Sequence, residues 1–97
     1  MNKRDHLLVC LAEECSEVSY AVSKVLRFGL GDKKPGQPLT NAQQIAEELN
    51  HVVAVAELLE ENGYIEKNTS FRLIEEKKVR VQHMMDFAES IGTLEVA

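Results

Sequence analysis

Three long segments in which apolar residues recur every third or fourth position dominate this 97-residue sequence. That spacing gathers apolar side chains on one side of an α-helix, whereas no segment alternates apolar and polar residues over the length of a strand. The three segments extend over about residues 5–28, 40–62 and 70–91. We therefore predict an all-α protein, a helical bundle of three long helices with room for a short fourth.

Residues that end or begin helices separate these segments. The stretch GLGDKKPGQP, residues 29–38, holds three glycines and two prolines, and a proline cannot continue a helix. Thr40 and Gln43 have the spacing of a capping box, which marks the start of the second helix. Gly63 and Gly92 follow the second and third segments, where a glycine commonly ends a helix.

The length of the chain favours a single domain, residues 1–97, that needs a second copy. A helical domain of this size buries only part of the surface that its unfolded chain exposes. The third segment carries apolar residues on two sides, which one chain cannot cover. We expect dimerisation to complete the bundle, in a homodimer or a homotetramer. The residues that remain uncovered are Leu73, Met84, Phe87 and Ile91.

The charge and hydropathy of the sequence exclude some classes of binding partner and indicate where in the cell the protein is expected. The chain has 16 acidic and 11 basic residues, a net charge of -5, which argues against nucleic acid or an anionic membrane as the main partner. No apolar run is long enough to span a bilayer, and the first residues, MNKRDH, do not lead into the apolar core of a signal peptide. We expect a cytoplasmic protein without a nucleic-acid or membrane partner.

Two of the expected helices place a glutamate inside the apolar stripe. At about 100° per residue, Glu14 lies within the apolar arc of its helix and Glu17 at its border. Glu48 and His51 take the same two positions on the second helix. A single glutamate of this kind can reach water from the helix edge or pair with a lysine. Two matched pairs on facing helices instead predict a divalent cation, because buried carboxylates need a counter-charge.

The sequence around these residues resembles a known superfamily. EECSE, residues 13–17, is similar to the EExxE motif of the all-α nucleoside triphosphate pyrophosphatases, which include the MazG-like proteins. EELNH, residues 47–51, resembles the second motif, ExxD, with Glu48 as its glutamate and His51 in place of its aspartate. SKVLRFG and KKVRVQHMMDFAESIGTLE are similar to the corresponding parts of small, often phage-encoded MazG-like proteins.

The resemblance implies an activity and a set of site residues. Members of the superfamily hydrolyse an NTP or dNTP to the monophosphate and pyrophosphate, in some cases to remove unwanted nucleotides, with Mg²⁺ bound by the two motifs. Carried over, Glu14, Glu17, Glu48 and His51 would be metal ligands. The catalytic residues would be Glu13, Glu14 and Glu17, with Glu13 supporting the cluster or orienting the attacking water.

Basic residues are candidates for binding the phosphates of such a substrate. Lys24 lies on the first helix and Lys78 on the third, between apolar residues. Lys24 could contact a phosphate, whereas for Arg27, further along the same helix, a position on the solvated face is at least as good an explanation. A lysine that reaches water past apolar neighbours explains Lys78 equally well. Further basic candidates are Lys33, Lys34, Lys77 and Arg80.

Because His51 stands where the motif has an aspartate, the resemblance does not decide whether this chain hydrolyses nucleotides. Mg²⁺ prefers oxygen ligands, whereas imidazole suits Mn²⁺, Co²⁺ or Zn²⁺ better. Three outcomes follow from the histidine: an active enzyme with a changed metal preference, an active enzyme with fewer ions, or a helical protein that binds a nucleotide or a partner without hydrolysis.

Overall fold

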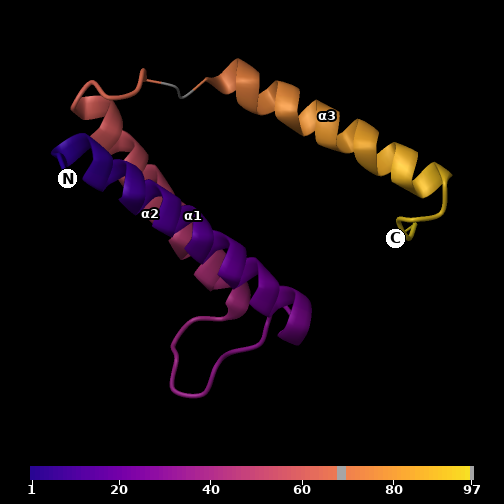
Figure 1. Cartoon of the computed structure of the whole chain (residues 1–97). Coiled ribbons are helices and arrows are strands. Elements are labelled where there is room, and N and C mark those ends of the chain that lie inside the picture. Colours follow the sequence, from indigo (N-terminus) through magenta and orange to yellow (C-terminus); the bar gives the residue numbers. More distant parts are fainter. Residues whose placement is uncertain (68–69, 97) are drawn as a thin grey trace. The chain divides into compact units, whose positions relative to one another are not determined.

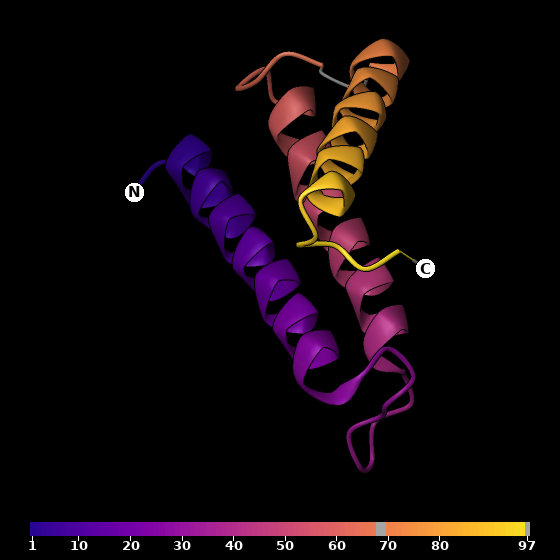
Figure 2. The same cartoon turned by 90° about the vertical axis from the view of Figure 1, so that its right-hand side faces the viewer.

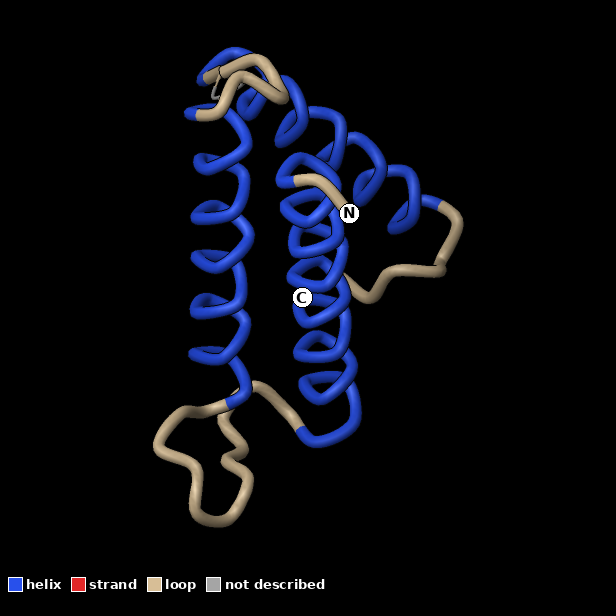
Figure 3. The backbone as a smooth tube through the Cα atoms, turned by 60° about the vertical axis from the view of Figure 1, so that its left-hand side comes forward, coloured by secondary structure: helices blue, strands red, loops and turns tan. Residues whose placement is uncertain are grey.

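The structure, a computed structural model, describes residues 1–67 and 70–96 and contains three helices in them: α1 (Lys3–Phe28), α2 (Asn41–Glu61) and α3 (Phe71–Ser90) (Figure 1). All other described residues form loops and turns, and no strand occurs among them (Figure 3). The predicted all-α fold with three long helices is confirmed, and each helix boundary lies within two residues of the expected one. The described residues contain no fourth helix. Completion of the bundle by dimerisation stays a prediction.

The chain divides into two compact units, residues 1–67 and residues 68–97. The first unit contains α1, α2 and the loop between them, and the second contains α3. The expectation of one domain over residues 1–97 stays a prediction. Every residue that the structure brings together at a candidate site belongs to the first unit.

Helices α1 and α2 pack against each other in opposite directions, joined by the loop of residues 29–40 (Figure 2). Ala21 on α1 and Leu59 on α2 are the buried apolar residues of this pair, 2% and 0% exposed. The remaining contact surface is half-buried, because each apolar stripe is wider than one partner helix can cover. The half-buried stripe residues are Leu7, Leu11, Val18, Val25, Ile45, Val52, Val55 and Ala56.

The start of α2 has the predicted capping box. The Thr40 hydroxyl accepts a hydrogen bond from the Gln43 backbone N–H at 3.1 Å, and the Gln43 side chain accepts one from the Thr40 N–H at 2.9 Å. Two otherwise unpaired N–H groups of the helix end are thereby satisfied. At the other end of the loop, Gly29 directly follows α1 and has φ +96°, a conformation that residues with a side chain rarely adopt.

The second unit is described by α3 and the residues after it. The Ser70 hydroxyl caps the helix by accepting from the Leu73 N–H at 3.3 Å. After Ile91, the N–H groups of Thr93 and Leu94 both donate to the Ala88 carbonyl. None of the helices in the described part of the chain combines the length and the apolar character that a membrane span requires.

Candidate functional site

Glu14 of α1 meets Glu48 and His51 of α2 where the two helices pack. Each of the three offers a ligand atom, and these atoms all lie within 4.8 Å of one another. The local cause is helical periodicity, because Glu48 and His51 are one turn apart on α2 and so lie on the same side. The antiparallel pairing of the helices then adds Glu14. This group, Glu14, Glu48 and His51, is called the acidic cluster below.

The acidic cluster lies at the border between the helix interface and the surface. The side chains of Glu48 and Glu14 are 13% and 29% exposed, and that of His51 is 50% exposed. Both glutamates are therefore half-buried, as their positions within the apolar stripes predict. The histidine lies further out, at the predicted border position.

The His51 ring nitrogen Nδ1 faces both carboxylates. It lies 3.3 Å from Oε2 of Glu48, within hydrogen-bond distance, and 3.7 Å from Oε2 of Glu14, beyond it. A ring with its proton on Nδ1 can donate to Glu48, whereas an unprotonated Nδ1 offers a lone pair in the same direction. The same atom can therefore serve as a hydrogen-bond donor or as a metal ligand.

The donor set fits a divalent cation. The carboxylates of Glu14 and Glu48 are half-buried and offer oxygen atoms within 4.8 Å of each other, so they repel each other when both are ionised. A cation between them would remove this repulsion. Carboxylate oxygens suit Mg²⁺ and Mn²⁺, while the imidazole nitrogen favours Mn²⁺, Co²⁺ or Zn²⁺ over Mg²⁺. The arrangement can thus hold a divalent ion close to the surface, where a phosphate could reach it.

The other two predicted acidic residues lie beside the acidic cluster on α1. Glu17 is one turn beyond Glu14 and Glu13 directly precedes Glu14, and both are exposed. Neither belongs to the group that the structure brings together. Their assignment as a ligand and as catalytic residues stays a prediction.

The two predicted phosphate-binding lysines have different surroundings. Lys24 is half-buried on α1, and its Nζ atom lies over the Tyr20 ring, 4.7 Å from the centroid. Lys78 belongs to α3 in the second unit and donates to Oε1 of Glu75 at 3.0 Å. Lys24 thus shares a unit with the acidic cluster, whereas Lys78 is engaged in an ion pair of its own.

A polar pocket at the loop end of α1 and α2 was not predicted from the sequence. Its volume is about 210 Å³, and Lys24, Lys34 and Asn41 line it together with two glutamines and a leucine. The loop sequence GLGDKKPGQP predicts only the end of a helix. The pair Pro35-Gly36 after Lys34 was the available signal, because it favours a tight turn that fixes the lysine.

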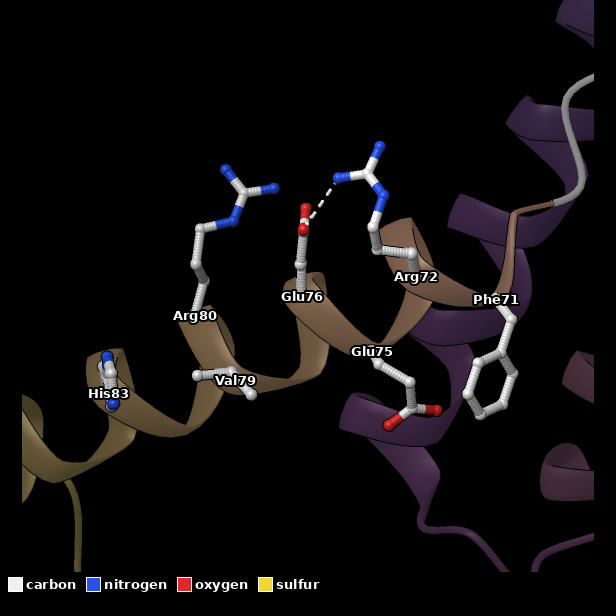
Figure 4. Close-up of a pocket in the computed structure, with 7 residues that line it drawn as sticks. All are labelled: Phe71, Arg72, Glu75, Glu76, Val79, Arg80 and His83. Atoms are coloured by element: carbon white, nitrogen blue, oxygen red, sulfur yellow. Dashed lines mark hydrogen bonds and ion pairs between the residues drawn. The ribbon is translucent and has the colours of Figure 1, made fainter.

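A second hollow follows one face of α3 (Figure 4). In this view Arg72 and Arg80 point to the same side as Glu76, and Arg72 donates to Glu76 at 2.8 Å. All lining residues come from this single helix. Side chains of one helix border a surface without enclosing a ligand, so the hollow is no candidate for the active site.

Comparison with known proteins gives one match. A family model, the MazG nucleotide pyrophosphohydrolase domain, matches residues 2–85. The matched range includes the acidic cluster, Glu13, Glu17, Lys24 and Lys78. No curated protein and no solved structure matches the chain.

Proposed function

The chain belongs to the MazG nucleotide pyrophosphohydrolase family, and from this premise we propose that it hydrolyses a nucleoside triphosphate. Water would cleave the anhydride between the α and β phosphates, and the products would be the nucleoside monophosphate and pyrophosphate. The observation that carries the proposal is the acidic cluster, since Glu14, Glu48 and His51 lie within 4.8 Å of one another on two different helices. A role in removing non-standard nucleotides is part of the proposal.

A divalent cation is the cofactor in this proposal. Glu14, Glu48 and His51 would hold it, with Glu17 as a fourth ligand one turn along α1. Such an ion neutralises polyphosphate charge and makes phosphorus more electrophilic. The imidazole in the donor set supports Mn²⁺ or a similar ion, with Mg²⁺ bound more weakly.

The remaining site residues would bind and orient the reactants. Glu13 and Glu17 are exposed carboxylates beside the acidic cluster, and a carboxylate there could accept a proton from the attacking water. Lys24 is the proposed phosphate ligand in the first unit. Lys78, in the second unit, is proposed for the same role. Its ammonium group would have to leave the ion pair with Glu75 in order to bind a phosphate.

The hydrogen-bond distance between His51 and Glu48 supports one alternative function. A donor that satisfies Glu48 reduces the need for a cation. The alternative is a catalytically impaired helical protein that binds a nucleotide or a partner.

Self-association is proposed on the basis of exposed apolar side chains. Leu8, Val22, Leu49 and Val53 of α1 and α2 are each at least 40% exposed. Large apolar side chains that stay exposed on a single chain are candidates for an interface between subunits. We propose a homodimer, or a homotetramer built from such dimers.

The experiment that tests the function is pyrophosphate release from a panel of ordinary and modified nucleoside triphosphates, with Mg²⁺ and Mn²⁺ supplied separately. Metal-dependent release from any of them supports the hydrolase. Saturable nucleotide binding without release would establish the alternative. Equal release with and without EDTA would contradict the assignment of the acidic cluster.

A further inference from the structure

We propose that the polar pocket at the loop end of α1 and α2 binds the terminal phosphates of the nucleoside triphosphate, the part that leaves as pyrophosphate. The identity of the anion rests on the proposed function, whereas the anion site itself rests on the pocket. The pocket's lining residues are Lys24, Lys34, Gln37, Leu39, Asn41 and Gln44. At about 210 Å³ it is smaller than the roughly 300–1,000 Å³ typical of pockets for whole small molecules, so it suits a part of a ligand.

The charges of the residues that line the pocket favour the binding of an anion. Lys24 comes from α1 and Lys34 from the loop, and the lining includes no acidic residue. Neither lysine forms an ion pair within residues 1–67 and 70–96. Two ammonium groups that border one pocket would each gain a charge-assisted hydrogen bond from a bound phosphate. The amides of Gln37 and Gln44 can supply further donors.

Hydrogen bonds to the start of α2 fix the backbone of the loop just before Lys34. The Asn41 side chain donates to the Gly29 carbonyl at 3.0 Å, and the N–H groups of Asn41 and Ala42 donate to the carbonyls of Asp32 and Leu30 at 2.9 and 3.0 Å. Asn41 is only 7% exposed, so the two bonds that it donates are partly shielded from water. A preformed site loses less conformational entropy on binding.

A tight turn completes the positioning of Lys34. The Gln37 N–H donates to the Lys34 carbonyl at 3.0 Å, and Gly36 between them has φ +81°. Proline followed by a glycine with positive φ is the pair that a type II turn favours. The turn places Lys34 and Gln37, its two ends, on the wall of the same pocket.

An adjoining hollow of about 380 Å³ decides between a phosphate and a nucleobase. It shares Lys24, Lys34 and Asn41 with the pocket. It adds the rings of Tyr20 and Phe28, together with Arg27, Pro35 and one acidic residue, Asp32. Cations already cover both rings: Lys24 lies 4.7 Å from the centroid of Tyr20, and Arg27 lies 4.9 Å from that of Phe28. A base would have to displace these cations in order to stack, whereas a phosphate gains from them.

The helices place the pocket next to the acidic cluster. Gln44 precedes Glu48 by one turn of α2, about 6 Å along the helix axis. Lys24 follows Glu14 by ten residues of α1, about 15 Å along its axis, and lies on the side of the helix that carries Glu17. Because residues four positions apart lie on the same side of a helix, Gln44 lies on the side of Glu48. A triphosphate with its α phosphate at the acidic cluster could extend its terminal phosphates toward the pocket.

The test is calorimetric binding of inorganic tripolyphosphate to the full chain in EDTA, which removes any contribution from a bound cation. Lys34→Gln and Lys24→Gln should each weaken binding by about tenfold or more, since each removes a charge-assisted hydrogen bond. Lys33→Gln is the matched control, because it removes an adjacent loop lysine that does not line the pocket. Equal weakening by Lys33→Gln and Lys34→Gln, or no saturable binding, would overturn the proposal.

A second measurement assigns the anion. If the pocket holds the terminal phosphates, Lys34→Gln should weaken triphosphate binding by about tenfold and leave monophosphate binding within about twofold. Equal losses for both nucleotides would mean that the pocket holds another part of the substrate, which overturns the assignment.

The pocket and the proposed function can fail separately. A chain that binds tripolyphosphate through Lys24 and Lys34 but hydrolyses no nucleotide would contradict the function and leave the anion site in place. A chain that hydrolyses triphosphates with an unchanged KM in the Lys34→Gln variant would contradict the pocket alone.

Discussion

The Nδ1 atom of His51 lies 3.3 Å from Oε2 of Glu48, one turn earlier on the same helix, and 3.7 Å from Oε2 of Glu14 on the facing helix. If the acidic cluster holds the proposed cation, the choice of metal would depend on this one histidine side chain. Imidazole is a poor ligand for Mg²⁺ and a good one for Mn²⁺ or Zn²⁺. The same ring can also satisfy the carboxylates by hydrogen bonding.

Replacing His51 by aspartate should raise the affinity for Mg²⁺ by at least about tenfold, because a hard anionic oxygen replaces a neutral nitrogen. Mg²⁺-dependent pyrophosphate release should rise with it, and the advantage of Mn²⁺ over Mg²⁺ should shrink. Metal titrations followed by thermal unfolding and by turnover measure both effects. His83→Asp on α3 is the control, and an unchanged Mg²⁺ affinity in His51→Asp would show that His51 is no ligand.

Glu14→Gln and Glu48→Gln should each lower metal-dependent turnover by about a hundredfold or more, because each removes an anionic ligand of the proposed cation. The helix content, measured by circular dichroism, should stay at that of the natural chain. Glu47→Gln changes the exposed neighbour on α2 and should leave turnover within about twofold. Full activity in both of the first two variants would contradict the assigned site.

Leu59→Ala should lower the free energy of unfolding by about 2–5 kcal/mol, because Leu59 is completely buried and its truncation leaves a cavity between α1 and α2. Leu58→Ala removes the same atoms from a residue that is 45% exposed and should cost much less. Urea unfolding of the two variants measures the difference. Similar losses in both would mean that the α1–α2 interface is packed differently.

Thr40→Ala should lower the free energy of unfolding by about 1 kcal/mol, because the Gln43 N–H loses its acceptor at the start of α2. Thr40→Ser keeps the hydroxyl and should stay close to the natural chain. Urea unfolding measures the stability of both variants. If Thr40→Ser is as unstable as Thr40→Ala, the stabilising group is the methyl group of Thr40 and the hydroxyl of the capping box is not.

Light scattering after size exclusion should give at least twice the mass of one chain, if exposed apolar side chains of α2 are covered by a second copy. Val53 is 52% exposed, and Val53→Glu should shift the mass toward that of a single chain by placing a charge in the interface. Ala54→Glu adds the same charge at the exposed neighbouring position and serves as the control. A single-chain mass for the natural protein would contradict the proposed dimer.

Local signals in the sequence account for the helices and for two of the three residues of the acidic cluster. The apolar period, the pair Thr40 and Gln43, and the glycines after the helices predict the boundaries to within two residues, because caps and periods act within a few positions of the chain. Glu48 and His51 face the same side for the same local reason.

The helices, their caps and the side of each helix on which its residues lie all follow from local sequence. Tertiary structure alone decided the register between α1 and α2, which brings Glu14 within 4.8 Å of Glu48 and His51 and leaves Glu17 exposed beside them. It also decided the loop conformation that adds Lys34 to Lys24 in one pocket. The physical reason is range: a helix period is set by neighbours along the chain, whereas helix pairing and loop conformation depend on packing and hydrogen bonds between residues far apart in sequence.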